Sequence, residues 1–299
     1  LTKKKSAAWI FTTIAILLTL GRFYLHRQNT KRWRWDDYLN SLALLSLIGF
    51  TTTYHLFAPI VNSAQLYLQN RGGKLPTDQV VRVALKINAA NNVFFFCTIY
   101  LVKASFLALY WQIFEVSRRF RCVWCGVTTY TVVSFLASFL SLFWQCGRPE
   151  HFLDGPWCNQ GGTLLERKLL WMWCALHVFG DFLLMTIPLV MLSRMMMPTS
   201  QKIGVAVVFC LVLVTIALDV LRTVFMVAQK PERENWKELW TLLEPPISVA
   251  ICALPCYGSL LVRTTKKGRL WEFVEGMSVS FGLSVDKSLG SLKRSVDAV

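Results

Sequence analysis

Seven apolar stretches constrain this chain more than any other feature of its sequence. A helix crosses the hydrocarbon of a bilayer with about 20 apolar residues, and glycine and proline are tolerated inside such helices. The stretches are 7–20 (extending to Leu25), 38–58, 91–114, 123–144, 170–192, 204–228 and 240–262. The sequence therefore predicts an all-α, polytopic membrane protein. We expect a seven-transmembrane-helix bundle over residues 1–262 and a basic, Ser-rich cytoplasmic tail over 263–299.

The composition favours the same class. Hydrophobic residues make up 54% of the chain and charged residues 16%, whereas soluble domains carry about a quarter charged residues. The net charge of +15 would also suit a nucleic-acid-binding protein. The basic residues, however, lie in short loops between apolar runs, where membrane orientation is encoded. We therefore expect the lipid bilayer as a partner and no nucleic acid.

The basic loops also predict an orientation, because Lys and Arg concentrate on the cytoplasmic side. Four segments carry them at about twice the density of the others, and these segments are 21–36, 115–122, 193–203 and 263–269. This pattern favours an N-terminus outside and a C-terminus inside, with the plasma membrane as the expected location. Lys3, Lys4 and Lys5 argue the other way. Ahead of a short apolar run they leave a cleaved signal peptide as the alternative, and the chain opens on Leu, which leaves room for residues upstream.

Two pairs of cysteines are of interest, one in an outer loop and one at an inner membrane edge. Cys146 and Cys158 bound CGRPEHFLDGPWC, a segment that this orientation places outside. An oxidising exterior would join them and close a loop worth about 3 kcal/mol. Cys122 and Cys125 form a single CxxC at an inner edge of the membrane. We interpret them either as inert thiols or as an acylation site.

Charged side chains also occur within the apolar stretches, and these are Lys103, Asp181, Asp219, Arg222 and Glu244. Such charges are rare, are usually paired or face a cavity, and mark functional sites by default. At about 1.5 Å per residue, Lys103, Asp181 and Asp219 share one depth, and Arg222 and Glu244 lie shallower. We predict a polar core that opens outward, with Lys103 paired to Asp181 or Asp219. His177 precedes Asp181 by four residues and shares its face. A structural network and a ligand pocket are both open interpretations of this core.

Motifs for catalysis and metal binding are absent. The four histidines form no HxxxH or HExxH pair, and GxSxG does not occur, so we expect no enzyme activity, catalytic residue, cofactor or metal. Asp36 and Asp37 in WRWDDYLN are similar to half of an aspartate-rich magnesium site, but a second cluster is missing. We interpret Trp35, Asp36 and Asp37 as a cytoplasmic-edge motif whose acids pair with Arg32 or Arg34.

Several segments in series carry a family resemblance. They are GRFYLHRQNTKRWRWDDYL, YLVKASFLALYWQIF, CGRPEHFLDGPWC, His177-x3-Asp181 followed by Pro188, and WTLLEPPISVAICALP. Over residues 21–262 the chain resembles the fungal rhodopsin-domain integral membrane proteins, a family of receptor-like seven-helix proteins. That family usually has Asn where His177 stands and a basic residue near Gln112. Stretch 240–262 lacks the lysine that retinal would need, so we expect no retinal.

The resemblance implies a receptor-like protein. It would bind an extracellular ligand at the outer polar core and signal through inner loops to a G protein or another cytoplasmic effector. The alternative is a membrane transporter, or a membrane-embedded enzyme of secondary metabolism, that uses the same core. Against transport, the seven single spans show no paired halves with broken helices.

Overall fold

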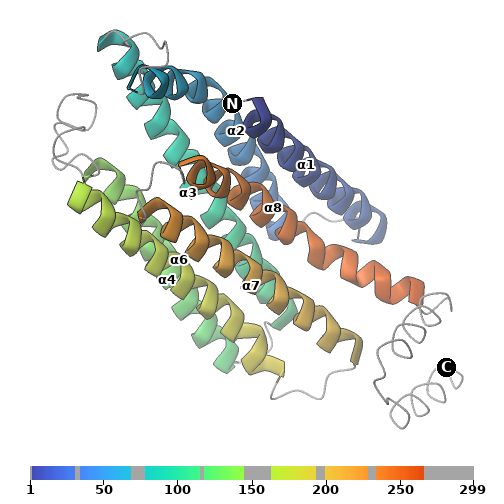
Figure 1. Cartoon of the computed structure of the whole chain (residues 1–299). Coiled ribbons are helices and arrows are strands. Elements are labelled where there is room, and N and C mark those ends of the chain that lie inside the picture. Colours follow the sequence, from blue (N-terminus) through green and yellow to red (C-terminus); the bar gives the residue numbers. More distant parts are fainter. Residues whose placement is uncertain are drawn as a thin grey trace, which may run out of the picture. The chain divides into compact units, whose positions relative to one another are not determined.

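The computed structural model describes residues 2–30, 34–68, 78–114, 118–144, 163–192, 199–227 and 234–265, and every described residue except Arg34 is helical (Figure 1). The helices are α1 (Thr2–Thr30), α2 (Trp35–Leu68), α3 (Asp78–Phe114), α4 (Arg118–Ser141), α6 (Thr163–Leu192), α7 (Thr199–Val227) and α8 (Glu234–Thr265). A short 3-10 helix, η1 (Leu142–Trp144), follows α4 directly. The prediction of an all-α, polytopic membrane bundle of seven helices is confirmed.

Five of these helices are long and apolar enough to cross a membrane. The spans are Lys5–Arg27, Trp35–Ile60, Gln79–Gln112, Phe120–Trp144 and Arg167–Ile187, and a shorter apolar segment is Leu239–Pro255. In α7, side chains are described only between Phe209 and Phe225. Side chains that face away from the bundle are apolar along α4, where Val132, Val133, Leu136 and Leu140 are exposed. Such an outer surface is what lipid tails cover.

The helices begin earlier than the apolar stretches do. Helix α3 starts at Asp78 and α8 at Glu234, whereas the predicted spans start at 91 and 240. Hydropathy marks the part of a helix that lies in hydrocarbon, and polar helix formers such as Glu and Lys extend the same helix beyond it.

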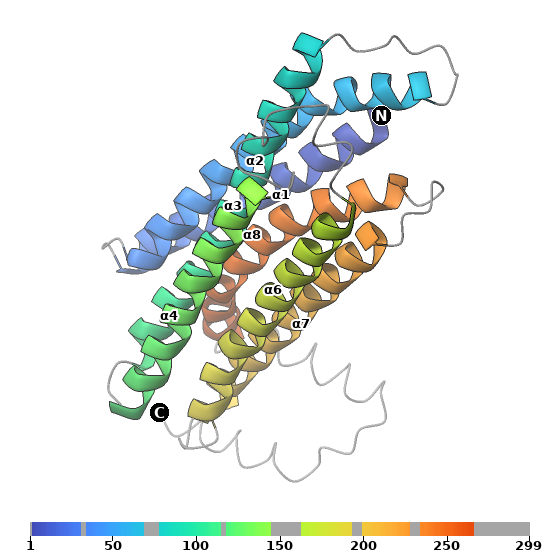
Figure 2. The same cartoon turned by 90° about the vertical axis from the view of Figure 1, so that its left-hand side faces the viewer.

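Residues 1–255 form one compact unit and 256–299 another, and all contacts described below lie within the first. In that unit α3 packs against α2, α4 and α6, and α6 also packs against α7. Figure 2 shows α6 and α7 side by side, with α1 next to α2. Helix α3 therefore contacts helices from both the early and the late part of the chain, and its side chains can join the two.

The α2–α3 pair is the most extensive helix contact, and one glycine sets its close approach. A Cβ atom on Gly49 would lie 2.8 Å from the Phe94 ring, a distance that no real contact tolerates. Small residues let membrane helices approach closely, so that packing and polar contacts can form between them. Here Ser46 Oγ donates to the Phe94 carbonyl at 3.0 Å, and Thr53 Oγ1 donates to Asn91 Oδ1 at 2.9 Å.

Candidate functional site

Six buried polar side chains from four helices form a central polar cluster in the bundle. It consists of Lys103 on α3, His177 and Asp181 on α6, Asp219 and Arg222 on α7, and Glu244 on α8. Spacings of three and four residues place the pairs on α6 and α7 on single helix faces. All six residues that the sequence singled out therefore lie together in the structure.

Lys103 is anchored to α6. Its Nζ lies 2.8 Å from Asp181 Oδ1 and donates a hydrogen bond to the backbone carbonyl of His177 at 2.9 Å. Gly180 leaves room for it, because a Cβ atom there would lie 3.2 Å from the Lys103 Nζ. Of the two acids predicted as partners, Asp181 is the one that the structure pairs with Lys103.

Arg222 connects α7 to α8. Its Nε lies 3.0 Å from Glu244 Oε2, and its Nη2 lies 3.7 Å from Asp219 Oδ1. The Nε–H does not point at the Glu244 oxygen, so this contact is an ion pair without a hydrogen bond. The guanidinium also lies over the Phe95 ring at 4.7 Å from its centroid, where the cation is attracted to the π face.

Three carboxyl groups lie in a row between these two cations. Asp219 interacts electrostatically with Asp181 and with Glu244, and a carboxylate oxygen of Asp219 lies within 4.8 Å of one of Glu244. Lys103 and Arg222 stand at the two ends of the row. The expectation that Arg222 and Glu244 lie shallower in the membrane than the rest stays a prediction, although their side chains contact the same cluster. Fully ionised, the cluster carries one excess negative charge, which adjacent buried carboxylates accommodate by sharing a proton or a cation.

A cavity of about 30 Å³ adjoins the cluster. It is lined by Ile99, Val102, Lys103, Phe106, Tyr110, Asp181, Leu184, Val212, Thr215, Asp219, Glu244, Ser248 and Ile251. Along α3 the lining runs mainly from Lys103 to Tyr110, so the cavity extends toward the end of the bundle where α3 finishes. The sequence predicted an opening toward the other end of the bundle, and that opening stays a prediction. A cavity of this size has room for water but not for an organic ligand, because pockets for such ligands measure roughly 300–1,000 Å³.

A second buried network, which we call the Arg22 cluster, comprises Arg22, Asp36, Asp37, Ser105, Gln112 and the Cys252 carbonyl. The Arg22 guanidinium bonds the Asp36 carboxylate, contacts Asp37 Oδ1 at 3.3 Å, and donates to the Cys252 carbonyl at 2.6 Å. Gln112 donates to Asp36 Oδ1 at 2.8 Å, and Ser105 donates to the Asp36 carbonyl at 3.0 Å. These contacts join α1, α2, α3 and α8.

The Arg22 cluster corrects one interpretation of the sequence. Asp36 and Asp37 were expected to pair with Arg32 or Arg34, yet the described ion-pair partner of both is Arg22. Helices α1 and α2 run antiparallel, and this brings Arg22 back to the start of α2. Arg34 contributes its backbone N–H, 3.4 Å from Asp37 Oδ2, and Arg32 lies outside the described residues.

Other predicted positions lie apart from both clusters. Trp35 is 78% exposed and contacts Tyr38, with the ring centroids 6.3 Å apart. Cys146 and Cys158 lie outside the described residues, so their disulfide stays a prediction. Cys122 and Cys125 are free and exposed on α4.

Comparisons with known proteins match most of the chain to one protein family. The fungal rhodopsin domain matches residues 21–263. A relative called Wortmanamides biosynthesis cluster protein C, from Talaromyces wortmannii, is 24% identical over 275 residues, which cover 84% of this chain and 68% of the relative. No solved structure matches the chain. Since the domain covers most of the sequence, the protein belongs to the fungal rhodopsin domain family.

Proposed function

We propose that the protein is a receptor-like seven-helix membrane protein in which a ligand changes the packing around the central polar cluster. The observation that carries this proposal is the pair of buried charged networks that flank one small cavity. Tyr110 lines that cavity from α3, and Ser105 and Gln112 of the same helix belong to the Arg22 cluster. The two networks together involve α1, α2, α3, α6, α7 and α8.

The physical basis for switching is the high cost of an unpaired charge. Breaking one member of a buried ion pair typically costs about 3–5 kcal/mol. A helix shift that separates Lys103 from Asp181 therefore has to give each of them another partner, and the neighbouring Asp219 is such a partner for Lys103. Packed interfaces of this kind adopt discrete arrangements rather than a continuum. A ligand that prefers one arrangement shifts the population toward it.

A transporter or membrane-embedded enzyme of secondary metabolism is the second candidate. The name of the relative from Talaromyces wortmannii, Wortmanamides biosynthesis cluster protein C, supports it. The cavity of about 30 Å³ disfavours it, because a metabolite-sized substrate does not fit among these charges. We therefore favour the receptor-like role, with an extracellular ligand and a cytoplasmic effector such as a G protein as proposed partners.

A ligand screen that also monitors helix movement tests this proposal. The full chain is purified into lipid nanodiscs, with Cys125 replaced by Ser and an environment-sensitive dye attached to Cys122. Extracellular compounds are then screened for their effect on the melting temperature. A receptor ligand should raise the melting temperature, since it binds only the folded state, and should also change the dye signal. Lys86→Met, an exposed change on α3, should respond like the parent. Turnover or liposome flux of a stabilising compound, with an unchanged dye signal, would favour the enzyme or transporter instead.

A further inference from the structure

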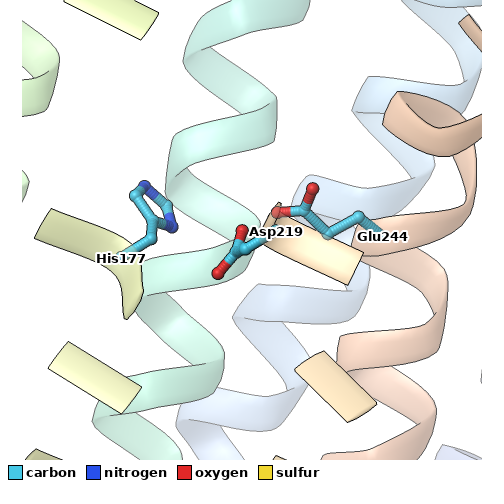
Figure 3. Close-up of side chains that lie close together, drawn as sticks. All are labelled: His177, Asp219 and Glu244. Atoms are coloured by element: carbon cyan, nitrogen blue, oxygen red, sulfur yellow. The ribbon is translucent and has the colours of Figure 1, made fainter. Parts of the chain in front are cut away.

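Three side chains of the central polar cluster converge from three different helices. His177 on α6, Asp219 on α7 and Glu244 on α8 each bring a ligand-type atom within 4.8 Å of the other two. Figure 3 shows the Asp219 carboxylate between the His177 imidazole and the Glu244 carboxylate. All three residues are buried. An imidazole and two carboxylates at such distances are a donor set for a metal ion.

Several atoms of this donor set have no hydrogen-bond partner in the described part of the chain. Neither ring nitrogen of His177 has a hydrogen-bond partner among the described residues, and the same holds for both carboxylate oxygens of Glu244 and for Asp219 Oδ1. His177 is also fully shielded from solvent, with aromatic neighbours Phe96 and Tyr100. Buried polar atoms are almost always hydrogen-bonded, and a group of exceptions in one place calls for an ion or water between them.

We propose that His177, Asp219 and Glu244 form a binding site for one divalent first-row transition metal ion of the Zn²⁺ class. The imidazole nitrogen selects this class, because Mg²⁺ and Ca²⁺ prefer oxygen ligands alone. The site is independent of the receptor role, since it requires only that the ion binds and stabilises the bundle.

The surrounding charges leave the three ligands available. Lys103 is held by Asp181 and by the His177 carbonyl, neither of which belongs to the donor set. Arg222 faces Oε2 of Glu244 and leaves Oε1 for the ion. Its Nη2 lies 3.7 Å from Asp219 Oδ1, which is beyond hydrogen-bonding distance. A cation also offsets the excess negative charge of the three adjacent carboxylates.

The three side chains must move closer together to bind one ion. Zinc binds nitrogen and oxygen at about 2.0–2.2 Å, so tetrahedral ligand pairs lie roughly 3.4 Å apart. From separations of up to 4.8 Å, pairs of ligand atoms must approach by up to about 1.4 Å, which rotation of the Glu244 and Asp219 side chains can supply. Asp219 and Glu244 also line the small cavity, which has room for water as a fourth ligand.

The test is metal binding by the full chain, using zinc chloride as the probe. The background is Cys122→Ser/Cys125→Ser, because exposed thiols bind zinc by themselves. The protein is purified in detergent, stripped with a chelator, re-equilibrated with zinc or magnesium chloride, and desalted. Bound metal is measured by elemental mass spectrometry and stability by thermal unfolding. We expect stoichiometric zinc and a melting temperature that rises with zinc concentration, with no effect of magnesium.

His177→Phe is the decisive variant, because it removes the imidazole donor and keeps a ring among Phe96 and Tyr100. It should lose the zinc and its stabilisation while the metal-free protein stays as stable as the parent or gains stability, since two buried nitrogens without partners are gone. His55→Phe, a change on the exposed face of α2, should keep both the bound zinc and the stabilisation by zinc. In the Cys122→Ser/Cys125→Ser protein with His177 intact, Co²⁺ should produce visible d–d absorption, so one readout does not depend on a substitution in the site. Failure of the parent to retain zinc, or full retention by His177→Phe, would overturn the proposal.

Discussion

At the scale of single residues, the protein places a lysine in an apolar bundle by surrounding it with acceptors. Lys103 contacts the Asp181 carboxylate at 2.8 Å and the His177 carbonyl at 2.9 Å. Placing a Lys at the centre of a membrane helix costs roughly 2.5–3.5 kcal/mol on insertion scales. Charge-assisted hydrogen bonds contribute about 1.5–3 kcal/mol each, so two of them are of the size needed to offset that cost.

Replacing Lys103 by Met should therefore destabilise the protein by about 3–5 kcal/mol, because Asp181 loses its counter-charge beside Asp219. Thermal unfolding and surface expression measure the effect. The double variant Lys103→Met/Asp181→Asn should recover part of the loss, and more of it than Lys103→Met/Asp219→Asn. Lys86→Met, on the exposed part of the same helix, should be close to neutral. Equal stability of Lys103→Met and the parent would show that the pair does not hold the bundle together.

Arg22 offers a matched test at the other network. Arg22→Gln leaves two buried carboxylates, Asp36 and Asp37, without their counter-charge. We expect a loss of about 3–5 kcal/mol in the free energy of unfolding, measured by thermal or denaturant unfolding. Arg27→Gln is the control, because Arg27 is exposed one turn further along α1. Similar melting temperatures for the two variants would contradict the proposed importance of the Arg22 cluster.

Sequence reasoning found the residues of the central cluster but not all of their partners. Charges inside apolar stretches are conspicuous, so Lys103, Asp181 and Glu244 were identified without a structure. Arg22 was missed because it follows the first apolar run directly and is not distinguishable from an ordinary loop arginine. The convergence of His177, Asp219 and Glu244 was also not predictable, because three ligands on three helices leave no spacing motif in the chain.

At the scale of helices, the positions of the seven helices could be predicted, whereas their starts could not. An apolar run indicates where a helix lies in hydrocarbon, and all seven runs overlap the observed helices α1 to α8. The first turns of α3 and α8 are polar, so hydropathy does not indicate where these helices begin.

The close approach of α2 and α3 predicts a large effect of one methyl group. Gly49→Ala would bring a Cβ atom to within 2.8–2.9 Å of the Phe94 ring. We expect a destabilisation of about 1–3 kcal/mol from overpacking, visible as a lower melting temperature. Gly126→Ala on α4 is the control, because nothing lies within 4 Å of its added Cβ, and it should be neutral or slightly stabilising. A Gly49→Ala protein as stable as Gly126→Ala would mean that the Phe94 ring turns aside, or the helices separate, at no cost.

The connection between α4 and α6 carries the predicted disulfide. Peptide mapping under non-reducing conditions should recover Cys146 and Cys158 in one linked fragment. Their removal by Ser substitution should cost about 3 kcal/mol in the chain-entropy description. Cys122 and Cys125, which are free in the structure, serve as the alkylation control. Alkylation of Cys146 and Cys158 in protein from the cell surface, without prior reduction, would refute the bridge.

At the scale of the whole molecule, orientation is the open prediction, with the N-terminus outside and the C-terminus in the cytoplasm. Epitope tags at both ends, probed on intact and on permeabilised cells, measure it. The N-terminal tag should be accessible on intact cells, and the C-terminal tag only after permeabilisation. The distribution of basic loops is the physical reason. An N-terminal tag that is protected from outside would revive the cleaved-signal alternative.

The pairing of Lys103 with Asp181 also has a consequence for synthesis on the ribosome. Helix α3 emerges before α6, and at about 5–20 residues per second the lysine waits several seconds for its aspartate. During that interval the translocon must release or retain a helix whose central charge has no counterpart. A variant that lacks Asp181 would therefore be expected to fail first at insertion, as chains cleared by quality control, before its folded state is ever populated.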